Sequence, residues 1–326
     1  MNYAVYGPDH VRSLLDYEGC IATVREAMAQ FTADGIAQPL RSIFPLGNGA
    51  ALAAMPGALS GSGGAGAKLI TVYPVHGRPG RSAHQGVIVL FDRDHGEVRC
   101  IADAESVTEI RTGAASAVAT DALARREAER LAVFGCGTQA ASHIRAIKLV
   151  RTLKEVLIWG RNPTTATAFA GRMAAETGLS VRAVEDGEEA ASAADIICTA
   201  TSSSTPILRA RWVRPGTHVN LVGSSHAGPT EVDSDLIVRS RYIADSRASA
   251  LAAAAEFLVA KQAGLIGDEH IVAEIGEVLL GRVPGRTSSE QITVYKSLGH
   301  VVQDLASVRY LRERAELQLH GCRSVL

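Results

Sequence analysis

The sequence lacks the features that mark secreted proteins and membrane proteins. Its five cysteines are scattered, which excludes a disulfide framework or a zinc site and fits thiols in a reducing compartment. No apolar run approaches the length that spans a bilayer. The first residues show neither the basic region nor the long apolar core of a signal peptide. The sequence therefore predicts a cytoplasmic protein that has no membrane partner.

Strong charge of either sign is also missing. The 33 lysine and arginine residues balance 34 aspartate and glutamate residues, and neither sign forms a long block. This pattern argues against a nucleic-acid partner and against a basic membrane-binding surface. The 326 residues, rich in alanine and glycine, are enough for two domains of a compact α/β protein.

What the sequence does contain is a dinucleotide-binding pattern near its centre. An apolar run at 131–134 has the character of a buried strand, and residues 139–150 have the apolar spacing of a helix. Between them, Gly135 would permit a tight turn. Gly137 has no Cβ and would let a pyrophosphate approach the backbone at the helix N-terminus. The predicted cofactor contacts in this stretch are Gly135, Gly137, Thr138, Gln139 and Ala140.

The segments after this turn alternate between strands and helices. They include strand candidates at 155–159, 195–200 and 218–222 and a helix candidate at 163–177. Such alternation is typical of a doubly wound parallel sheet, the Rossmann arrangement. Because ligands bind where parallel strands end, the residues that follow two of these strands are further predicted cofactor contacts, namely Thr201, Ser202 and Gly223.

The residues after the second strand of this series indicate which cofactor is used. An acid there would accept the 2′-hydroxyl of NAD, whereas a basic group suits the 2′-phosphate of NADP. The chain has Arg161 and Asn162 at this point and no carboxylate. Because an arginine can pair with a phosphate and stack on adenine, we predict NADPH as the preferred cofactor, with NADH as the alternative.

The first third of the chain has a different order of elements. Two helices are predicted within 9–34. Strands then follow one another without intervening helices, at 68–73, 86–91 and 98–102. This order predicts a separate, mostly antiparallel sheet. The expected fold is therefore α/β with two domains, a Rossmann domain at 119–299 and an α+β domain made of 1–118 with 300–326.

Three cations of this α+β domain lie in unusual settings. Lys68 opens an apolar strand after a glycine-rich loop, and Arg41 lies in a short extended piece between two prolines. Arg111 lies at a helix start rich in small residues, next to Thr112. Guanidinium groups suit a carboxylate because they can bind both of its oxygens. The sequence therefore predicts a site for a small acid.

Several short motifs, taken together, are more specific than any one of them. They are Arg41, Gly66-Ala-Lys68, His84-Gln85-Gly86, Thr108-Glu-Ile-Arg-Thr-Gly-Ala-Ala-Ser116, the Gly135 turn, Glu274-Ile-Gly-Glu-Val-Leu-Leu-Gly281 and Val294-Tyr-Lys-Ser-Leu-Gly299. In these motifs the chain resembles the ornithine cyclodeaminase/μ-crystallin family over essentially its whole length. The resemblance implies a homodimer in which the α+β domain binds substrate and forms the dimer. It also implies that Arg41, Lys68 and Arg111 bind a substrate carboxylate.

One departure from the cyclodeaminase pattern bears on the reaction. Cyclodeaminases carry an aspartate shortly after the strand expected at 218–222, and the matching residue here is Ser225. A serine cannot act as a carboxylate base or hold an ammonium group by charge. Family members with a non-acid here resemble imine reductases. The resemblance thus implies NADPH-dependent reduction of Δ1-pyrroline-2-carboxylate, Δ1-piperideine-2-carboxylate or both, to L-proline or L-pipecolate.

Each predicted residue has an expected part in this reaction. Arg41 and Arg111, with Thr112 beside them, would hold the carboxylate. Lys68 would contact the same carboxylate or keep the imine nitrogen protonated, and Ser225 would hydrogen-bond that nitrogen. Lys296 is expected to close the nicotinamide side of the cofactor site.

Two alternatives from other classes remain open at this stage. The first is an amino-acid deaminating enzyme, an ornithine cyclodeaminase or an alanine dehydrogenase, and Ser225 argues against it. The second is a non-catalytic, crystallin-like protein that binds NADPH as a ligand. The retained set of Arg41, Lys68 and Arg111 argues for catalysis.

Overall fold

The computed structural model describes residues 3–61, 63–73 and 84–323. The chain forms two units, which we call unit 1 (Met1–Arg111 with His300–Leu326) and unit 2 (Thr112–Gly299). Helix α3 (Ala104–Leu123) runs through the division. The boundary expected after residue 118 falls inside this helix, where neither a turn nor a linker marks a domain boundary.

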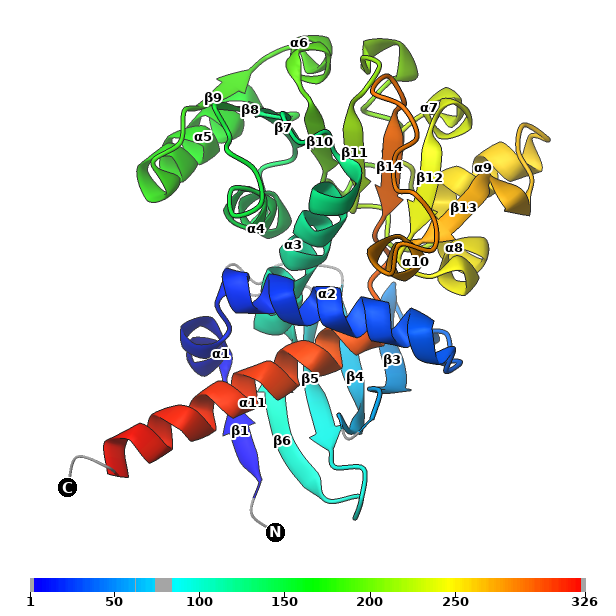
Figure 1. The fold of residues 1–326 in the computed structure, drawn as a ribbon. Helices are drawn as coiled ribbons and strands as arrows, with labels where there is room; N and C mark the ends of the chain where they lie inside the picture. The colour runs from blue at the N-terminus through cyan, green and yellow to red at the C-terminus, as the bar shows by residue number, and fades with distance from the viewer. Residues whose placement is uncertain (1–2, 62, 74–83, 324–326) are drawn as a thin grey trace. The chain divides into compact units, whose positions relative to one another are not determined.

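Unit 1 is a six-stranded sheet with helices on one face. The sheet order is β1-β6-β5-β4-β3-β2, antiparallel throughout except between β1 and β6. The strands are β1 (Ala4–Tyr6), β2 (Ser42–Gly47), β3 (Ala50–Ala58), β4 (Ala65–Val72), β5 (His84–Phe91) and β6 (Val98–Asp103). The helices are α1 (Pro8–Leu14), α2 (Tyr17–Asp34), the start of α3, and α11 (Val301–Arg323). Helices α2 and α11 run side by side, and α11 packs on β3, β4 and β5 (Figure 1).

The two faces of this sheet differ in burial. Residues paired across neighbouring strands share a face, so Met55, Lys68 and Ile88 form one row, and all three are buried. The next residue along β4, Leu69, points to the opposite face and forms a row there with Val87. Leu69 is 40% exposed and Val87 is 41% exposed. Apolar side chains therefore cover both faces, and those of the second face are exposed in the described part of the chain.

Unit 2 is built on an eight-stranded parallel sheet, which confirms the predicted Rossmann arrangement. Its strands are β7 (Arg130–Phe134), β8 (Glu155–Trp159), β9 (Val181–Val184), β10 (Ile196–Thr199), β11 (His218–Leu221), β12 (Arg241–Ala244), β13 (Ile271–Glu274) and β14 (Thr293–Lys296). Its helices are the rest of α3, α4 (Thr138–Ile147), α5 (Pro163–Thr177), α6 (Gly187–Ala193), α7 (Ser234–Arg239), α8 (Arg247–Ala253), α9 (Ala255–Gln262) and α10 (Ile275–Leu279).

The strand order of this sheet creates a site for ligands. The order is β13-β12-β14-β11-β10-β7-β8-β9, so the chain moves from β7 to β8 on one side and later returns to β10 on the other side of β7. The crevice at the carboxyl ends of β7 and β10 is therefore a topological switch point, where open α/β sheets bind ligands.

Some short elements were not expected from the sequence. Strand β14 lies between β11 and β12 in the middle of the sheet although it is the last strand of the chain, and β1, β13, α8 and α9 were also not predicted. Residues 294–299 were recognised in the sequence only as a motif, and no strand was expected there. Among the described residues, no helix combines the length and the apolar content that crossing a bilayer requires.

Candidate active site

The turn after β7 depends on a glycine. Gly135 has a φ of +129°, a conformation that residues with a side chain rarely adopt. Its N–H donates to the carbonyl oxygen of Trp159 at 2.9 Å. An added Cβ would lie 2.5 Å from the carbonyl oxygen of Ala200. The turn thus lies between the end of β8 and the end of β10, at the switch point.

The second glycine leaves space beside the helix that follows. Gly137 is exposed, is the N-cap residue of α4, and offers no side-chain cap to the first turn. An added Cβ at this position would meet nothing within 4 Å. Thr138 is exposed, Gln139 is half-buried, and Ala140 is fully buried. Open space at a helix N-terminus with an uncapped first turn fits a pyrophosphate.

The end of β8 presents one exposed cation. Arg161 and Asn162 are both exposed, but the Asn162 side chain accepts a hydrogen bond from the Thr165 N–H at 3.0 Å and caps α5. The Asn162 side chain is therefore used as the cap of α5, whereas the guanidinium of Arg161 is exposed just after β8. Cys136 packs close by, since its Sγ would lie 2.6 Å from a Cβ added to Gly160.

The predicted residues after β10 and β11 are tied to one carboxylate that the sequence did not single out. The Thr201 N–H and hydroxyl both donate to Glu231 at 2.7 Å. The Gly223 N–H donates to the same side chain at 2.8 Å. Ser202 is exposed and Ser225 is half-buried. Glu231 thus joins two of the loops that were predicted to line the cofactor site.

Lys296 lies at the end of β14 and is fully buried. Its Nζ donates to the Ser224 carbonyl and hydroxyl oxygens at 2.6 Å and to Glu256 at 3.0 Å. Lys296 and Glu256 form an ion pair whose side chains are both 0% exposed. An ammonium group has three donor protons, and these three contacts use them. Lys296 therefore holds a loop in place in this structure and has no donor left for a cofactor.

In unit 1, two of the predicted substrate-binding cations share one buried carboxylate. Asp304 of α11 accepts hydrogen bonds from Arg111 Nε at 2.8 Å and from Lys68 Nζ at 3.3 Å, both at Oδ1. Lys68 also donates to the Thr108 hydroxyl at 2.6 Å, and Arg111 donates to Gln303 at 3.0 Å. The exposed fractions of the three charged side chains are 3%, 4% and 0% for Lys68, Arg111 and Asp304. Two cations and one anion leave one net positive charge in the interior.

Burial shifts the protonation of this cluster. It lowers the pKa of Lys68 to about 8, with Asp304 raising that pKa and Arg111 and Arg41 lowering it further. Burial also acts to raise the pKa of Asp304, but Arg111 and Lys68 outweigh burial, and the pKa is lowered. At neutral pH Asp304 is therefore ionised, and Lys68 carries a proton that it can release near pH 8.

Two further residues, Arg41 and Thr112, were predicted to bind the substrate carboxylate. Arg41 is half-buried just before β2, close enough for its charge to lower the pKa of Lys68. Thr112 is buried in α3, one residue after Arg111.

Sequence reasoning missed Asp304, Glu231 and Glu256. The available signal for Asp304 was a carboxylate in the stretch 301–308 of α11, where every residue is buried. Glu231 follows a Gly-Pro-Thr turn and Glu256 lies near the start of α9, and neither setting distinguishes a buried carboxylate from a surface one.

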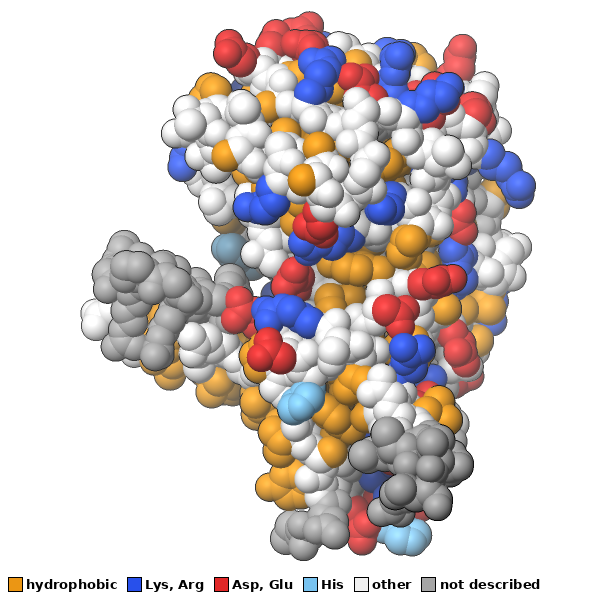
Figure 2. Space-filling model, turned by 90° about the vertical axis from the view of Figure 1, so that its left-hand side faces the viewer, with side chains coloured by type: hydrophobic (Ala, Val, Ile, Leu, Met, Phe, Trp, Pro, Cys, Tyr) orange, Lys and Arg blue, Asp and Glu red, His pale blue; other side chains and the backbone are white. Residues whose placement is uncertain are grey.

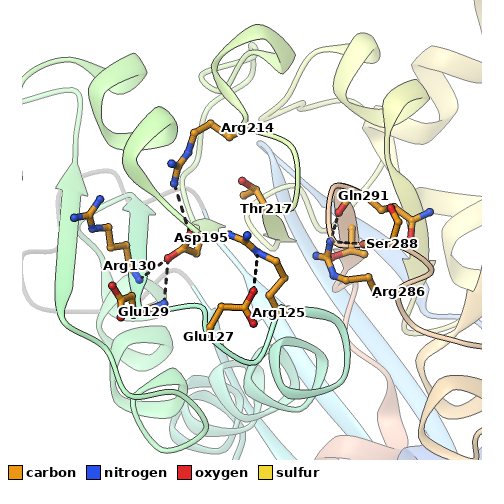
Figure 3. A network of polar contacts seen from close by, with 12 residues as sticks. Arg125, Glu127, Glu129, Arg130, Asp195, Arg214, Thr217, Arg286, Ser288 and Gln291 are labelled. Carbon is orange, nitrogen blue, oxygen red and sulfur yellow. Dashed lines mark hydrogen bonds and ion pairs between the residues drawn. The ribbon is translucent and has the colours of Figure 1, made fainter.

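A third carboxylate of unit 2, that of Asp195, lies at the opposite end of β10. Asp195, just before the strand, accepts hydrogen bonds from Arg125 at 2.9 Å and from the Glu129 and Arg130 N–H groups at 3.1 Å (Figure 3). Arg214 is 3.6 Å from the same carboxylate. This network fixes the amino end of the strand, away from the switch point.

Comparison with known proteins gives consistent results. A curated Δ1-pyrroline-2-carboxylate reductase from Bacillus cereus is 33% identical over 95% of this chain and 96% of that protein. The ketimine reductase mu-crystallin of Mus musculus is 34% identical over 92% of both chains. These names confirm the expected class, a reductase.

Solved structures agree on the fold and on nicotinamide binding by relatives. Thermococcus litoralis Δ1-pyrroline-2-carboxylate reductase in complex with NADH and L-proline has a TM-score of 0.92 and 29% identity, and 98% of each chain is covered. An archaeal alanine dehydrogenase dimer with bound NAD has a TM-score of 0.91 and 30% identity, with 98% of this chain and 97% of that chain covered. The model of the ornithine cyclodeaminase/mu-crystallin family matches residues 4–318. The chain therefore belongs to the ornithine cyclodeaminase/mu-crystallin family.

Proposed function

We propose that the protein reduces a cyclic imino acid with NADPH. The observation that carries the proposal is the buried cluster of Lys68, Arg111 and Asp304, whose net positive charge suits a substrate carboxylate. The glycine turn of unit 2 supports the cofactor part, because Gly137 leaves open space at the N-terminus of α4. A relative in complex with NADH and L-proline supports a nicotinamide cofactor and a cyclic amino acid as the product.

The residues of this chain would orient the substrate and control its proton. A bound nicotinamide cofactor would supply the hydride for C2 of the imine, and the C=N π electrons would pass to the nitrogen. Arg41 and Arg111 would hold the carboxylate, and Thr112 would lie beside it. Lys68, protonated below about pH 8, would keep the imine nitrogen protonated and C2 electrophilic. Ser225 would accept or donate a hydrogen bond at that nitrogen.

The test follows cofactor oxidation with Δ1-pyrroline-2-carboxylate, Δ1-piperideine-2-carboxylate, and pyruvate plus ammonia. We expect turnover with one or both cyclic imines, which also decides the ring size. Activity with pyruvate and ammonia alone would replace the proposal by an alanine dehydrogenase, the activity named for one structural neighbour. Ammonia release from ornithine would instead indicate a cyclodeaminase. Cofactor binding without turnover of any of these compounds would favour a crystallin-like binding protein.

The proposed pyrophosphate site, the open space beside Gly137 at the N-terminus of α4, can be tested without disturbing the fold. Gly137→Ala places a methyl group in open space with φ at −94°, so the melting temperature should not change. The methyl group would meet the pyrophosphate, and we expect the Kd of NADPH to rise by about tenfold or more. The matched control is Gly171→Ala in α5, whose Cβ also meets nothing within 4 Å and which should leave the Kd unchanged. Equal Kd values of NADPH in the two variants would contradict a pyrophosphate site at Gly137.

NADPH preference is proposed to come from Arg161. Arg161 is exposed and lies two residues after β8, where Rossmann domains bind the adenosine ribose. Arg161→Gln should raise the Kd of NADPH roughly tenfold and that of NADH less than about twofold. Tighter binding of NADH than of NADPH by the unmodified protein would contradict the proposal.

The carboxylate site is tested through Arg41, the least buried of its cations. Arg41→Gln should raise the KM for the imino acid about tenfold or more while the Kd of NADPH stays the same. Arg99→Gln is the control, since Arg99 lies in the same sheet but pairs with Asp92 on the surface. Parallel loss of cofactor and substrate binding in the Arg41 variant would refute this role.

We also propose that the protein forms a homodimer through the second face of the unit 1 sheet. The cross-strand row of Leu69 and Val87 is exposed, and Phe44 of β2 and Val5 of β1 are 55% and 64% exposed. Figure 2 shows hydrophobic side chains gathered along the left-hand edge of unit 1 in that view. A contiguous exposed apolar face marks an interaction surface. The same apolar face of a second copy of the chain would cover this face. One structural neighbour is named as a dimer.

The dimer is tested by the mass of the protein in solution. Leu69→Lys adds a charge to the middle of the face and should convert the dimer to a monomer, as measured by light scattering after size-exclusion chromatography. Val259→Lys adds the same charge at a residue of α9 that is 44% exposed, and should leave the mass unchanged. A monomer before any substitution would refute the proposal.

A further inference from the structure

Glu231 is a buried carboxylate whose acceptor positions are all used by the protein. Its Oε1 accepts from the Thr201 N–H and hydroxyl, both at 2.7 Å. Its Oε2 accepts from the Thr199 hydroxyl at 2.7 Å and from the Gly223 N–H at 2.8 Å. A carboxylate offers about four lone-pair sites. Burial raises the pKa of Glu231, and the hydrogen bonds from Thr201 and Thr199 and the charge of Lys296 act against that rise. Each of its two oxygens accepts one backbone N–H, a group that can only donate.

These four bonds join the ends of two neighbouring strands. Thr199 is the last residue of β10 and Thr201 lies two residues after it, and Gly223 follows β11. A Cβ added to Gly223 would lie 2.2 Å from the Thr201 carbonyl oxygen and 2.5 Å from Glu231 Oε1. The two loops therefore approach each other more closely than any residue with a side chain at position 223 would allow.

A second buried carboxylate extends the network to a third strand. Glu256 accepts from the Glu231 N–H at 3.1 Å and from Lys296 Nζ at 3.0 Å, and it also accepts the hydroxyl of Ser224. Lys296 is the last residue of β14, which lies next to β11. Glu231 and Glu256 thus connect the carboxyl ends of β10, β11 and β14.

The position of these strand ends gives the network its significance. The adenosine half of the cofactor is assigned to the β8 side of the Gly135 turn, where Arg161 lies. The other half must then extend over the opposite side of β7, along the ends of β10 and β11. Gly135 directly borders Ala200, the residue before Thr201. The loops fixed by Glu231 are therefore those that the nicotinamide ring would meet.

We propose that Glu231 is a positioning residue that fixes the loops at Thr201 and Gly223 so that the nicotinamide ring faces the imine. This role rests on the proposed reduction reaction. In this role Glu231 would act through the four groups that donate to it and not by contact with cofactor or substrate.

Glutamine cannot replace Glu231 in this setting. Its amide would present a donor, the NH2 group, where one carboxylate oxygen now stands. Either oxygen accepts a backbone N–H, from Thr201 at Oε1 or from Gly223 at Oε2. A glutamine therefore opposes two donors in both of its orientations, and one of the two loops must move.

The decisive experiment measures Glu231→Gln by three readouts. Misplacement of the ring should slow hydride transfer in single turnovers by about 100-fold. The primary isotope effect with cofactor deuterated at the transferred position should rise toward its full value. The Kd of NADPH should rise about tenfold, whereas that of the fragment 2′-phospho-ADP-ribose, which ends before the nicotinamide, should change less than about twofold.

Asp195→Asn is the matched control. It removes the charge of a carboxylate that binds two backbone N–H groups at the amino end of the same strand. This variant should lower the melting temperature but leave hydride transfer and the ratio of the two Kd values unchanged. If Glu231→Gln does not fold, Thr199→Val replaces it, because it removes one buried donor to Glu231 and adds none. That variant should slow hydride transfer on the order of several-fold.

The outcomes separate the two proposals. The positioning role would be overturned if Glu231→Gln transferred hydride as fast as the control Asp195→Asn. The same comparison applies to Thr199→Val if Glu231→Gln does not fold. Equal loss of affinity for NADPH and for the fragment would also overturn it. If the unmodified protein reduces no imino acid, the proposed function fails, and the Kd ratio still decides whether Glu231 positions the nicotinamide half.

Discussion

The cluster around Asp304 offers the sharpest test of how unit 1 handles charge. Asp304→Asn keeps the shape of the side chain and removes its charge, so Lys68 and Arg111 lose their shared partner. The carboxylate is 0% exposed and its Oδ1 lies 2.8 Å from Arg111 and 3.3 Å from Lys68. At an effective dielectric constant near 20, the attraction across 3.3 Å is about 5 kcal/mol. Breaking a buried pair by removing one partner typically costs about 3–5 kcal/mol, and we expect that loss in the free energy of unfolding.

The same substitution should change the pH dependence of the protein. Asp304 raises the pKa of Lys68 against the effect of burial, so its removal should lower that pKa further below about 8. Since the folded pKa of Lys68 lies below the ordinary value near 10.4, unfolding takes up a proton between these values. Its contribution to stability therefore increases as the pH rises from about 8 to about 10.4. In the variant this window should begin at a lower pH.

Two assays measure these effects. Urea unfolding at several pH values gives the free energy of unfolding, and the pH profile of kcat/KM gives the pKa of Lys68 in the free protein. The alkaline limb of that profile should move to lower pH in Asp304→Asn. The control is Asp103→Asn, in which an asparagine can still accept the Ser106 N–H at the start of α3 and should cost less than about 1 kcal/mol. The stabilising role of Asp304 would be refuted if Asp304→Asn were as stable as this control and the alkaline limb of its kcat/KM profile stayed at the same pH.

Two further predictions concern unit 2. Burial lowers the pKa of His143 to about 4, below its ordinary value of 6.5, so its contribution to stability is present above pH 6.5 and is lost as the pH falls toward 4. Between pH 7 and pH 5 the free energy of unfolding, measured with urea, should fall by about 2 kcal/mol because of His143. His143→Gln should remove this part of the pH dependence, and an unchanged slope of stability against pH would contradict the assignment. Arg151 donates to the carbonyl oxygens of Thr120 and Ala124 at the end of α3, at 3.1 and 3.3 Å. Arg151→Met should therefore lower the free energy of unfolding by about 2–3 kcal/mol, whereas Arg126→Met, at an exposed residue nearby, should change it by less than about 0.5 kcal/mol; equal effects would refute the capping role.

The parts of the fold that could be predicted are those with local signals. The Gly135 turn combines an apolar strand, two glycines and a helix within about 20 residues, and each of these patterns is visible in the sequence. The division of the chain was harder to place, because α3 carries one uninterrupted helical pattern from unit 1 into unit 2. Strand β14 was not predicted, and its place in the middle of the sheet comes from pairing with β11 and β12, which lie far from it in the sequence.

The site shows the same limit. The settings of Lys68 and Arg111 predicted an acid-binding pair, and the structure brings them together at one carboxylate. That carboxylate, Asp304, lies 193 residues after Arg111, so no local pattern connects them. Lys296 shows the opposite case. It was expected to close the nicotinamide side of the cofactor site, and only the structure shows that Ser224 and Glu256 use its three donor protons.

The late position of β14 and α11 in the chain has a consequence for biosynthesis. Strand β14 completes the middle of the unit 2 sheet, and α11 covers the inner face of the unit 1 sheet. Both lie after residue 292, so until the last residues are synthesised the unit 2 sheet lacks a central strand and the unit 1 sheet lacks a helix that covers it. During most of translation the nascent chain exposes the apolar rows of unit 1 and an interrupted parallel sheet, the state in which chains aggregate or need a chaperone. A chain that stops before β14 should therefore fail to fold in both units at once.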